Sequence, residues 1–462
     1  MKIFKKSKVR SLLTIGGLCL GSSVNGNVPY AEIVFDEVWE TVNESFYDPK
    51  FGGLDWPAFG SQYREAVLKA QTRAEMNDLI NELLQSLKYS HLRLIDGEGG
   101  LAGMDVPGGL AVPSIEFEII GRGFFVRSSG STAVSLGDRI LEIGERSIDE
   151  VLMALEDAGF SEQSQLFYAS SLINAGLSGD PGSEVSLKIY NDFGEKRVSA
   201  TRHLRTDTEW ISIPGMPSSQ EISLEHKFLE DGVAYLRFSM FAPAIMPEIR
   251  AFIQNIPQDC PGLIIDLRGN PGGTGLMAAG LLGLLVEEHK PAGRLLLRSG
   301  ELRFNGFAQS QAFLGKVAVL VNERSASTSE FFASAVQDNE RGQIIGAKTA
   351  GMALASLIKP LRNGSSLQYV IANFERADGT FIEGVGVEPD VSVMWTLEDL
   401  KMRNDPAMSA ALDYIFDRHP TKTPEMTERG DDEGDTAGLE IETEPDEAVD
   451  FEVEEGERSE DR

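Results

Sequence analysis

The sequence predicts a multidomain α/β protein, and three observations lead to this fold class. The chain has 462 residues, of which 42% are hydrophobic and 8% aromatic, enough for several buried cores. Apolar residues first recur at helical spacing, then alternate along short strands, and finally form near-continuous strands separated by helical stretches. The last pattern is typical of a sheet that is covered by helices on both faces.

Residues 1–26 have the layout of a secretory signal peptide. A basic start precedes the short apolar stretch Leu12–Leu20 and then small residues, with Val24–Gly26 as the cleavage site. This stretch is too short to span a bilayer, and no later run is long and apolar enough. A lipid anchor on Cys19 is the less favoured alternative, since no small residue precedes it. We therefore expect an exported protein, periplasmic or extracellular, whose mature form keeps only Cys260 and has no internal disulfide.

The next two regions differ in hydrophobic period. Residues 27–104 are expected to form a helical domain, with one helix from Glu32 and others around Ala58–Ala70 and Ala74–Leu87. Residues 105–204 contain short alternating strands and turns, which predict a compact β-rich module.

Residues 205–420 alternate strands with helical stretches and are expected to form an α/β core. The predicted strands are Gly262–Leu267, Lys316–Val321 and Gln343–Ile345. The predicted helices are Pro247–Asn255, Leu276–Glu288 and Ser329–Gln337.

Charge and composition exclude some functions. The stretch from Glu425 to Arg462 has 18 acidic and 3 basic residues and so carries half of the net charge of −30. Residues 421–462 are therefore expected to form a disordered tail. An acidic balance argues against nucleic acid as a partner, which requires clustered Lys and Arg. The five histidines are scattered, so no metal site and no cofactor are expected.

Two short segments of the expected core carry candidate chemistry. "DLRGNPGGTG" follows a buried strand, and its glycines favour either a tight strand-to-helix turn or an oxyanion hole made of backbone N–H groups. "VNERSASTSE" precedes a helix, where Ser327 and Glu330 have the spacing of a capping box. A serine between a strand and a helix N-terminus is also how nucleophiles are presented, and the two interpretations are compatible for neighbouring serines.

A nucleophilic serine requires a base, because its hydroxyl is weakly reactive by itself. Of the histidines, His91 is the strongest candidate, since it follows Ser90 where a helix passes into an extended segment. A purely structural role for His91 is the alternative. Lys348, in "GAKTAG", is the candidate lysine base.

Several motifs, in order along nearly the whole chain, resemble the tail-specific or C-terminal processing serine proteases and the core of the tricorn protease. They are "LLQSLKYSHLRL", "LGDRILEIGERSI", "GLIIDLRGNPGG", "VNERSASTSE", "GAKTAG" and "DGTFIEGVGVEPDV". The resemblance implies an α/β serine protease core of the ClpP/crotonase-like type, with a PDZ-like module over residues 105–204.

The resemblance also implies roles for individual residues. The nucleophile falls on Ser327. In the processing branch a lysine acts as base, but its position holds Met352, whose thioether cannot take the proton, and Lys348 is out of register. The branch that uses serine, histidine, serine and glutamate matches better. It implies His91 as base and Ser90 as its neighbour in the set.

The fourth member of this set is a glutamate that fixes the imidazole through Ser90. It falls on Glu383 in "FIEGVG", with Glu388 in "GVEPD" as the reserve. Backbone N–H groups of Gly272 or Gly273 and of Thr328 are implied as the oxyanion hole.

The PDZ-like module implies peptide binding as an added strand. The expected contacts are Gly108, Gly109, Leu110 and Ala111, and a long segment separates the two halves of the module.

The first functional hypothesis is an exported serine endopeptidase that cleaves peptides or unfolded proteins. An inactive homologue that binds peptides or acts as a scaffold is the alternative, suggested by Met352. An esterase is less favoured because no G-x-S-x-G motif occurs. The substrate is expected to be a polypeptide; an oligomeric state is left open.

Overall fold

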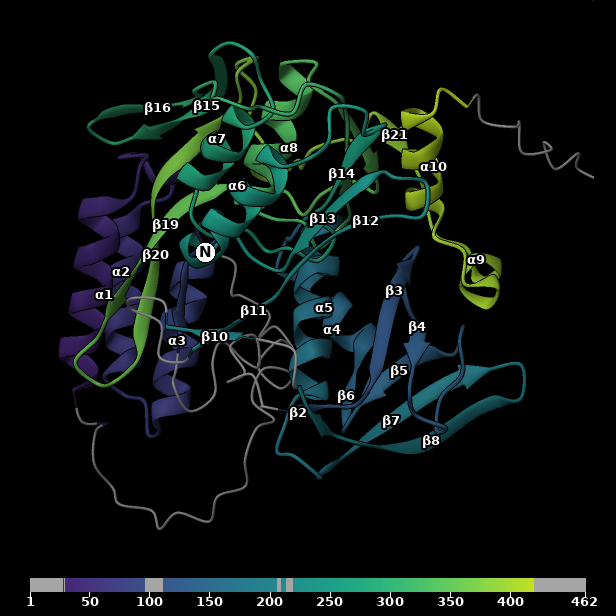
Figure 1. Cartoon of the computed structure of the whole chain (residues 1–462). Helices are drawn as coiled ribbons and strands as arrows, with labels where there is room; N and C mark the ends of the chain where they lie inside the picture. The colour runs from purple at the N-terminus through teal and green to yellow at the C-terminus, as the bar shows by residue number, and fades with distance from the viewer. Residues whose placement is uncertain (1–27, 29, 96–110, 206–208, 213–218, 419–462) are drawn as a thin grey trace, which may run out of the picture. The chain divides into compact units, whose positions relative to one another are not determined.

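The computed structural model describes residues 28, 30–95, 111–205, 209–212 and 219–418. The expected signal peptide and acidic tail lie outside these residues, as do Gly108, Gly109 and Leu110. The described part of the chain is a mixed α/β protein, as the sequence predicts, with N-terminal helices and several sheets (Figure 1).

Three N-terminal helices form the first layer. Two of them begin at side-chain caps: Asp55 accepts a hydrogen bond from the N–H of Ala58, and Thr72 accepts one from the N–H of Glu75. Their apolar stripes pack together and against a long strand of the core. Figure 1 shows the ribbon of α1 beside that of this strand, β20. The elements are α1 (Ala31–Ser45), η2 (Phe51–Gly53), α2 (Trp56–Val67), α3 (Arg73–Gln85) and β20 (Ser366–Glu375).

A second region is a six-stranded antiparallel sheet in the order β3-β4-β5-β7-β8, with β6 paired to β5 and two helices packed on the sheet. Its elements are β3 (Ile115–Ile120), β4 (Gly123–Ser129), β5 (Arg139–Ile143), β6 (Arg146–Ser147), α4 (Ile148–Asp157), α5 (Glu162–Leu177), β7 (Glu184–Asn191) and β8 (Gly194–Thr201). The helix α5 fills the long segment that the sequence left without an element.

Small strand pairs connect this region to the core: β2 (Ala111–Val112) with β9 (His203–Leu204), and β10 (Glu209–Ile211) with β11 (Gln220–Ile222).

The core sheet has the order β12-β13-β14-β17-β18-β21 and is parallel except for β12. Its strands are β12 (Leu224–Phe228), β13 (Ala234–Phe238), β14 (Gly262–Asp266), β17 (Lys316–Val321), β18 (Gln343–Gly346) and β21 (Val391–Ser392). Alternate residues face opposite ways: Leu263 and Ile265 pack on one side, and Ile264 packs on the other. Both faces are thus covered, which confirms the prediction from the continuous apolar strands.

Helices on the first face are η3 (Pro243–Ile245), α6 (Met246–Gln254), α7 (Leu276–Gly283) and α8 (Thr328–Asp338); α10 (Pro406–Ile415) covers the second, and α9 (Leu397–Met402) precedes it. The prediction that the helix from Leu276 reaches Glu288 was wrong. The helix ends at Gly283, where a Cβ atom would lie 2.3 Å from the carbonyl oxygen of Phe307.

A second core sheet has the order β1-β20-β15-β16, with β19 paired to β20. Its remaining strands are β1 (Arg93–Ile95), β15 (Lys290–Leu297), β16 (Gly300–Gly306) and β19 (Leu354–Pro360).

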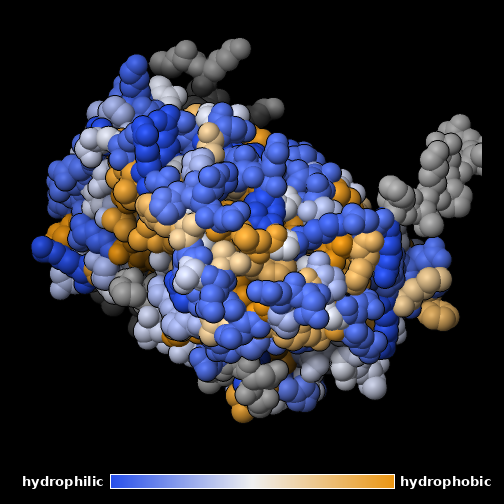
Figure 2. Space-filling model, turned by 45° about the horizontal axis from the view of Figure 1, so that its top comes forward, coloured by the Kyte–Doolittle hydropathy of each residue, from blue (hydrophilic) through white to orange (hydrophobic). Residues whose placement is uncertain are grey.

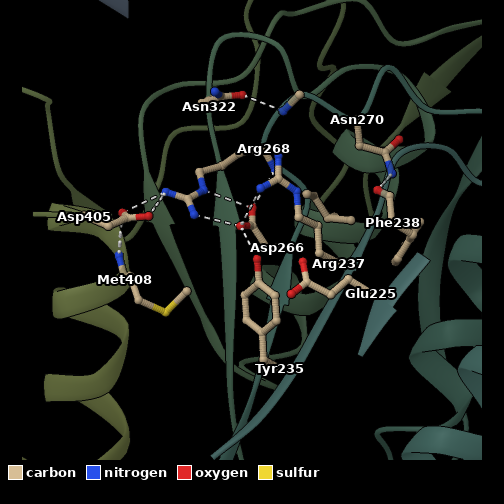
Figure 3. A network of polar contacts seen from close by, with 12 residues as sticks. Glu225, Tyr235, Arg237, Phe238, Asp266, Arg268, Asn270, Asn322, Asp405 and Met408 are labelled. Atoms are coloured by element: carbon tan, nitrogen blue, oxygen red, sulfur yellow. Dashed lines mark hydrogen bonds and ion pairs between the residues drawn. The ribbon is translucent and has the colours of Figure 1, made fainter. Parts of the chain in front are cut away.

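A buried ion-pair network holds the glycine-rich loop after β14 (Figure 3). The carboxylate of Asp266 is fully buried and accepts hydrogen bonds from the guanidinium of Arg268 and the hydroxyl of Tyr235. Arg268 also donates to both oxygens of Asp405, which caps the start of α10 by accepting from the N–H of Met408. The network therefore ties the loop to the C-terminal helix.

Asp266→Asn is expected to lower the free energy of unfolding by about 3 kcal/mol, because it leaves part of a buried guanidinium unpaired. Burial alone would raise the pKa of Asp266, but the neighbouring guanidinium groups lower it, so the native state holds the charged form. Urea unfolding measures the difference. Asp192→Asn is the matched control, because the Asp192 side chain is 89% exposed. Equal effects of the two changes would contradict a stabilising network.

The surface of the folded region mixes hydrophilic and hydrophobic side chains, with hydrophobic clusters between hydrophilic ones (Figure 2). Leu276 and Phe307 are among the large apolar residues that are more than half exposed. Exposed apolar residues are common on folded proteins, so these clusters alone do not define a site. No described helix has the length and apolar character needed to cross a membrane.

Candidate active site

The strand β1 carries His91 from the N-terminal helices to the core. It pairs antiparallel with β20, with Arg93 opposite Gln368, and His91 lies two residues before this pair. The backbone of His91 has φ 61°, a left-handed conformation that costs about 1–3 kcal/mol in a non-glycine residue. Such strain is concentrated at functional sites, and here it turns the chain directly before the strand.

Ser90, His91 and Glu383 form one hydrogen-bonded set. The hydroxyl of Ser90 lies 2.6 Å from His91 Nδ1 and donates to Glu383 Oε2 at 3.0 Å. The other carboxylate oxygen of Glu383 accepts the Ser90 N–H at 2.9 Å. Since the single hydroxyl proton of Ser90 is directed at the carboxylate, its oxygen accepts the proton of His91 Nδ1. The second ring nitrogen, Nε2, then carries the lone pair.

The electrostatics favour a neutral imidazole. Burial lowers the pKa of His91 to about 4, and the positive charge of Arg93 acts in the same direction. Burial raises the pKa of Glu383, whereas the hydrogen bonds from Ser90 and Ala353 oppose that rise. At neutral pH the ring is therefore able to accept a proton at Nε2.

Ser327 lies at the junction between the strand β17 and the helix α8. Its backbone has φ 54° and ψ −117°, so this residue too has a strained conformation. The residues on either side, Ala326 and Thr328, are buried, whereas Ser327 is half-buried. The neighbouring serines are engaged: Ser325 donates to the carbonyl of Leu267, and Ser329 donates to that of Asn270. Ser329 thus does not cap the helix.

Glu330 is fully buried beneath Ser327. One carboxylate oxygen accepts the N–H of Ser327 at 2.9 Å and that of Met352 at 3.0 Å. The other accepts the hydroxyl of Thr349 at 2.6 Å and the N–H of Gly351 at 2.8 Å. Burial raises the pKa of Glu330 to about 7, although these four donors favour the carboxylate. The sequence indicated only its capping contact to Ser327; it also fixes the 349–352 loop.

One peptide group connects the two halves of the site. The carbonyl of Met352 accepts the N–H of Ser327 at 3.0 Å, and the N–H of Ala353, in the same peptide group, donates to Glu383 Oε2 at 2.7 Å. His91, Ala326 and Met352 also line a common cavity. Residues more than two hundred positions apart are therefore brought to one place.

The glycines before Ser327 approach it closely. A Cβ atom on Gly272 would lie 2.7 Å from the Cβ of Ser327 and 2.8 Å from the N–H nitrogen of Thr328, so only glycine fits. The N–H of Gly272 donates to the side chain of Asn270. Within the described part of the chain, the N–H groups of Gly273 and Thr328 have no hydrogen-bond acceptor. Gly273 is therefore the more suitable of the two glycines as an oxyanion donor.

Lys348, the alternative base, and Glu388, the reserve for the glutamate, pair with each other. The ammonium of Lys348 pairs with the exposed carboxylate of Glu388 at 3.3 Å. Glu383, by contrast, contacts Ser90 directly. Among the described residues no group of three or more potential metal ligands is present.

The antiparallel region contacts the site through α5. The hydroxyl of Ser164 donates to the carbonyl of Ala350, and Tyr168 packs with Ala326 and Met352. These contacts were missed from the sequence. At the other side of this region, Ala111 was expected to contact a bound peptide. Its N–H donates to the carbonyl of Gly179, so this donor already has an acceptor within the chain. The flanking groove, of about 890 Å³, is lined by β3 and by core residues such as Arg324.

Family models match two parts of the chain: peptidase family S41 over residues 232–393 and the tricorn protease C1 domain over residues 31–85. A carboxyl-terminal-processing protease of Synechocystis sp. is 27% identical over 426 residues, which cover 84% of this chain and 89% of the relative. The chloroplastic C-terminal processing peptidase of Tetradesmus obliquus is 26% identical, over 78% of this chain and 77% of its own.

Two solved structures share the fold. The photosystem II D1 C-terminal processing protease has a TM-score of 0.54 at 21% identity, covering 79% of this chain and 94% of its own. Mature CPAF has a TM-score of 0.58 at 16% identity, covering 83% and 96%.

The match to peptidase family S41 and the carboxyl-terminal-processing relatives support a serine-type peptidase.

Proposed function

We propose that this protein is an exported endopeptidase that cleaves polypeptides with Ser327 as nucleophile and His91 as general base. The observation that carries the proposal is the double hydrogen bond of Ser90, to His91 Nδ1 and to Glu383. It orients the ring and leaves Nε2 unprotonated. Met352, at the position of the lysine base, makes the histidine necessary, since a thioether is not a base.

In the first step, the Ser327 hydroxyl gives its proton to His91 Nε2 as its oxygen bonds to the substrate carbonyl carbon. The carbonyl electron pair moves to oxygen, where the N–H groups of Gly273 and Thr328 stabilise the oxyanion, by about 3–4 kcal/mol per donor in comparable sites. The imidazolium then gives the proton to the leaving amine. Water, deprotonated by the same nitrogen, releases the acyl group from Ser327.

The domain roles are part of the proposal. Residues 27–104 supply Ser90 and His91, residues 205–420 supply the nucleophile, and residues 105–204 act as a PDZ-like module that guides a peptide through the adjoining groove. We also propose that residues 1–26 direct export. N-terminal sequencing of the mature protein, expected to begin at Asn27, tests this.

A fluorophosphonate probe tests whether the serine is activated. The wild-type protein is expected to be labelled at Ser327, located by mass spectrometry, and to degrade denatured casein. Ser327→Ala is expected to do neither while keeping its melting temperature. If the folded wild-type protein is not labelled, the result supports the alternative hypothesis that the protein is an inactive homologue that binds peptides.

The same labelling rate reports the pKa of the base. Because the native pKa of His91 is lowered to about 4, the reactive neutral form persists below the ordinary histidine pKa of about 6.5. Labelling is expected to decline only as pH falls further, when His91 and Glu383 become protonated. A midpoint at or above about 6.5 would contradict the assignment.

A further inference from the structure

A cavity of about 170 Å³ lies beside the proposed base and nucleophile. Its wall includes His91 itself, Ala326, the residue before Ser327, and Pro271, the residue before Gly272. A substrate side chain in this cavity would lie against His91 and the residue before Ser327, a position that suits a residue next to the cleaved bond.

Eight of the twelve residues that line the cavity are apolar or aromatic. Met352 and Ala326 pack with Tyr168, Phe160 and Phe167, which belong to α5 and the segment before it. Leu92 and Tyr89 complete this part of the wall. The inserted helix and the methionine that replaces the expected lysine thus face the same space.

Three polar groups of the wall already have partners. Arg93 Nε donates to the side-chain oxygen of Gln368, and the Gln368 amide donates to the hydroxyl of Ser356. His91 Nδ1 is bound to Ser90. A charged side chain in the cavity would lose water and displace these contacts, whereas an apolar one would not.

The volume limits the size of the occupant. A dry cavity of about 150 Å³ accommodates benzene, so 170 Å³ suits a side chain of the size of leucine, methionine or phenylalanine. Alanine would leave most of the space empty, and an indole ring would be too large.

We propose that this cavity is a specificity subsite, in which Met352 and Phe167 select a medium-sized apolar side chain directly flanking the cleaved bond. The inference rests on the proposed peptidase function. Met352 thereby has a role in recognition at the position where related enzymes are expected to hold their base.

Digestion of a denatured proteome, with cleavage sites located by mass spectrometry, tests the subsite. The wild-type protein is expected to show at least about tenfold enrichment of Leu, Met or Phe at one of the two positions flanking the cleaved bond. Phe167→Ala enlarges the cavity and should raise cleavage next to Trp, relative to Leu, by about tenfold. Met352→Ala should act in the same direction, and the volume-conserving Met352→Leu should preserve the profile.

Phe193→Ala is the matched control for Phe167→Ala, because Phe193 lies at a hairpin end with 97% of its surface exposed. Its cleavage profile should equal that of the wild type. An unchanged profile in both folded enlarging variants, or a wild-type preference for Asp, Glu, Lys or Arg, overturns the subsite while leaving the peptidase intact. Absence of fluorophosphonate labelling in the wild type would instead overturn the proposed function.

Discussion

Replacing His91 by asparagine is expected to lower kcat for peptide cleavage by about 10⁵–10⁶-fold, which corresponds to roughly 7–8 kcal/mol. Without an imidazole, the Ser327 proton has no acceptor, because Met352 occupies the lysine position and Lys348 pairs with Glu388 at the surface. Asparagine is chosen because it tolerates the left-handed backbone at this position better than alanine.

Single-turnover kinetics with a fluorogenic peptide measure this loss. The double variant His91→Asn/Ser327→Ala should be no slower than either single variant, because the two residues act as one unit. His226→Asn is the control: His226 pairs with Glu248 at the surface and should be dispensable. Substantial activity in folded His91→Asn would remove His91 as the base.

Replacing Glu383 by glutamine is expected to lower kcat by about 10³–10⁴-fold, with a smaller effect on KM. The carboxylate accepts from the N–H and hydroxyl of Ser90 and from the N–H of Ala353. An amide supplies only one oxygen for these three donors. The Ser90 hydroxyl would then turn its proton to His91 Nδ1, and Nε2 would carry a hydrogen where a lone pair is required.

Glu388→Gln is the matched control for Glu383→Gln. Both residues belong to the segment that the sequence offers for the glutamate, but the carboxylate of Glu388 is exposed and pairs with Lys348. Its replacement should leave kcat within about twofold, since exposed pairs contribute at most about 1 kcal/mol. An equal loss in both variants would show that Glu383 has no special role.

The sequence was most informative where local chemistry is strong. The apolar strands and their helices were placed within one to two residues in most cases, because buried parallel strands have long hydrophobic runs. The segment containing Ser90 and His91 was located, but its distance from Ser327 was not, since β1 pairs with a strand more than 270 positions away.

The parts that could not be predicted depend on tertiary contacts. The helix α5 has buried polar residues, such as Gln165 and Ser170, so it lacks a single apolar stripe. Glu330 accepts hydrogen bonds from Thr349 and Gly351 only because the 349–352 loop folds back against the start of α8, and the sequence does not show this tertiary contact. Likewise, the sequence does not show that Asn270 occupies the N–H of Gly272.

The peptide group between Met352 and Ala353 has a consequence for how such sites diverge. It holds the backbone of Ser327 and the carboxylate of Glu383 through its own C=O and N–H, so these contacts do not depend on the side chain at position 352. A lineage could therefore exchange a lysine for another residue there without dismantling the scaffold, provided that a histidine had already taken over proton transfer. The side chain at position 352 is then free to adapt to the substrate instead of serving proton transfer.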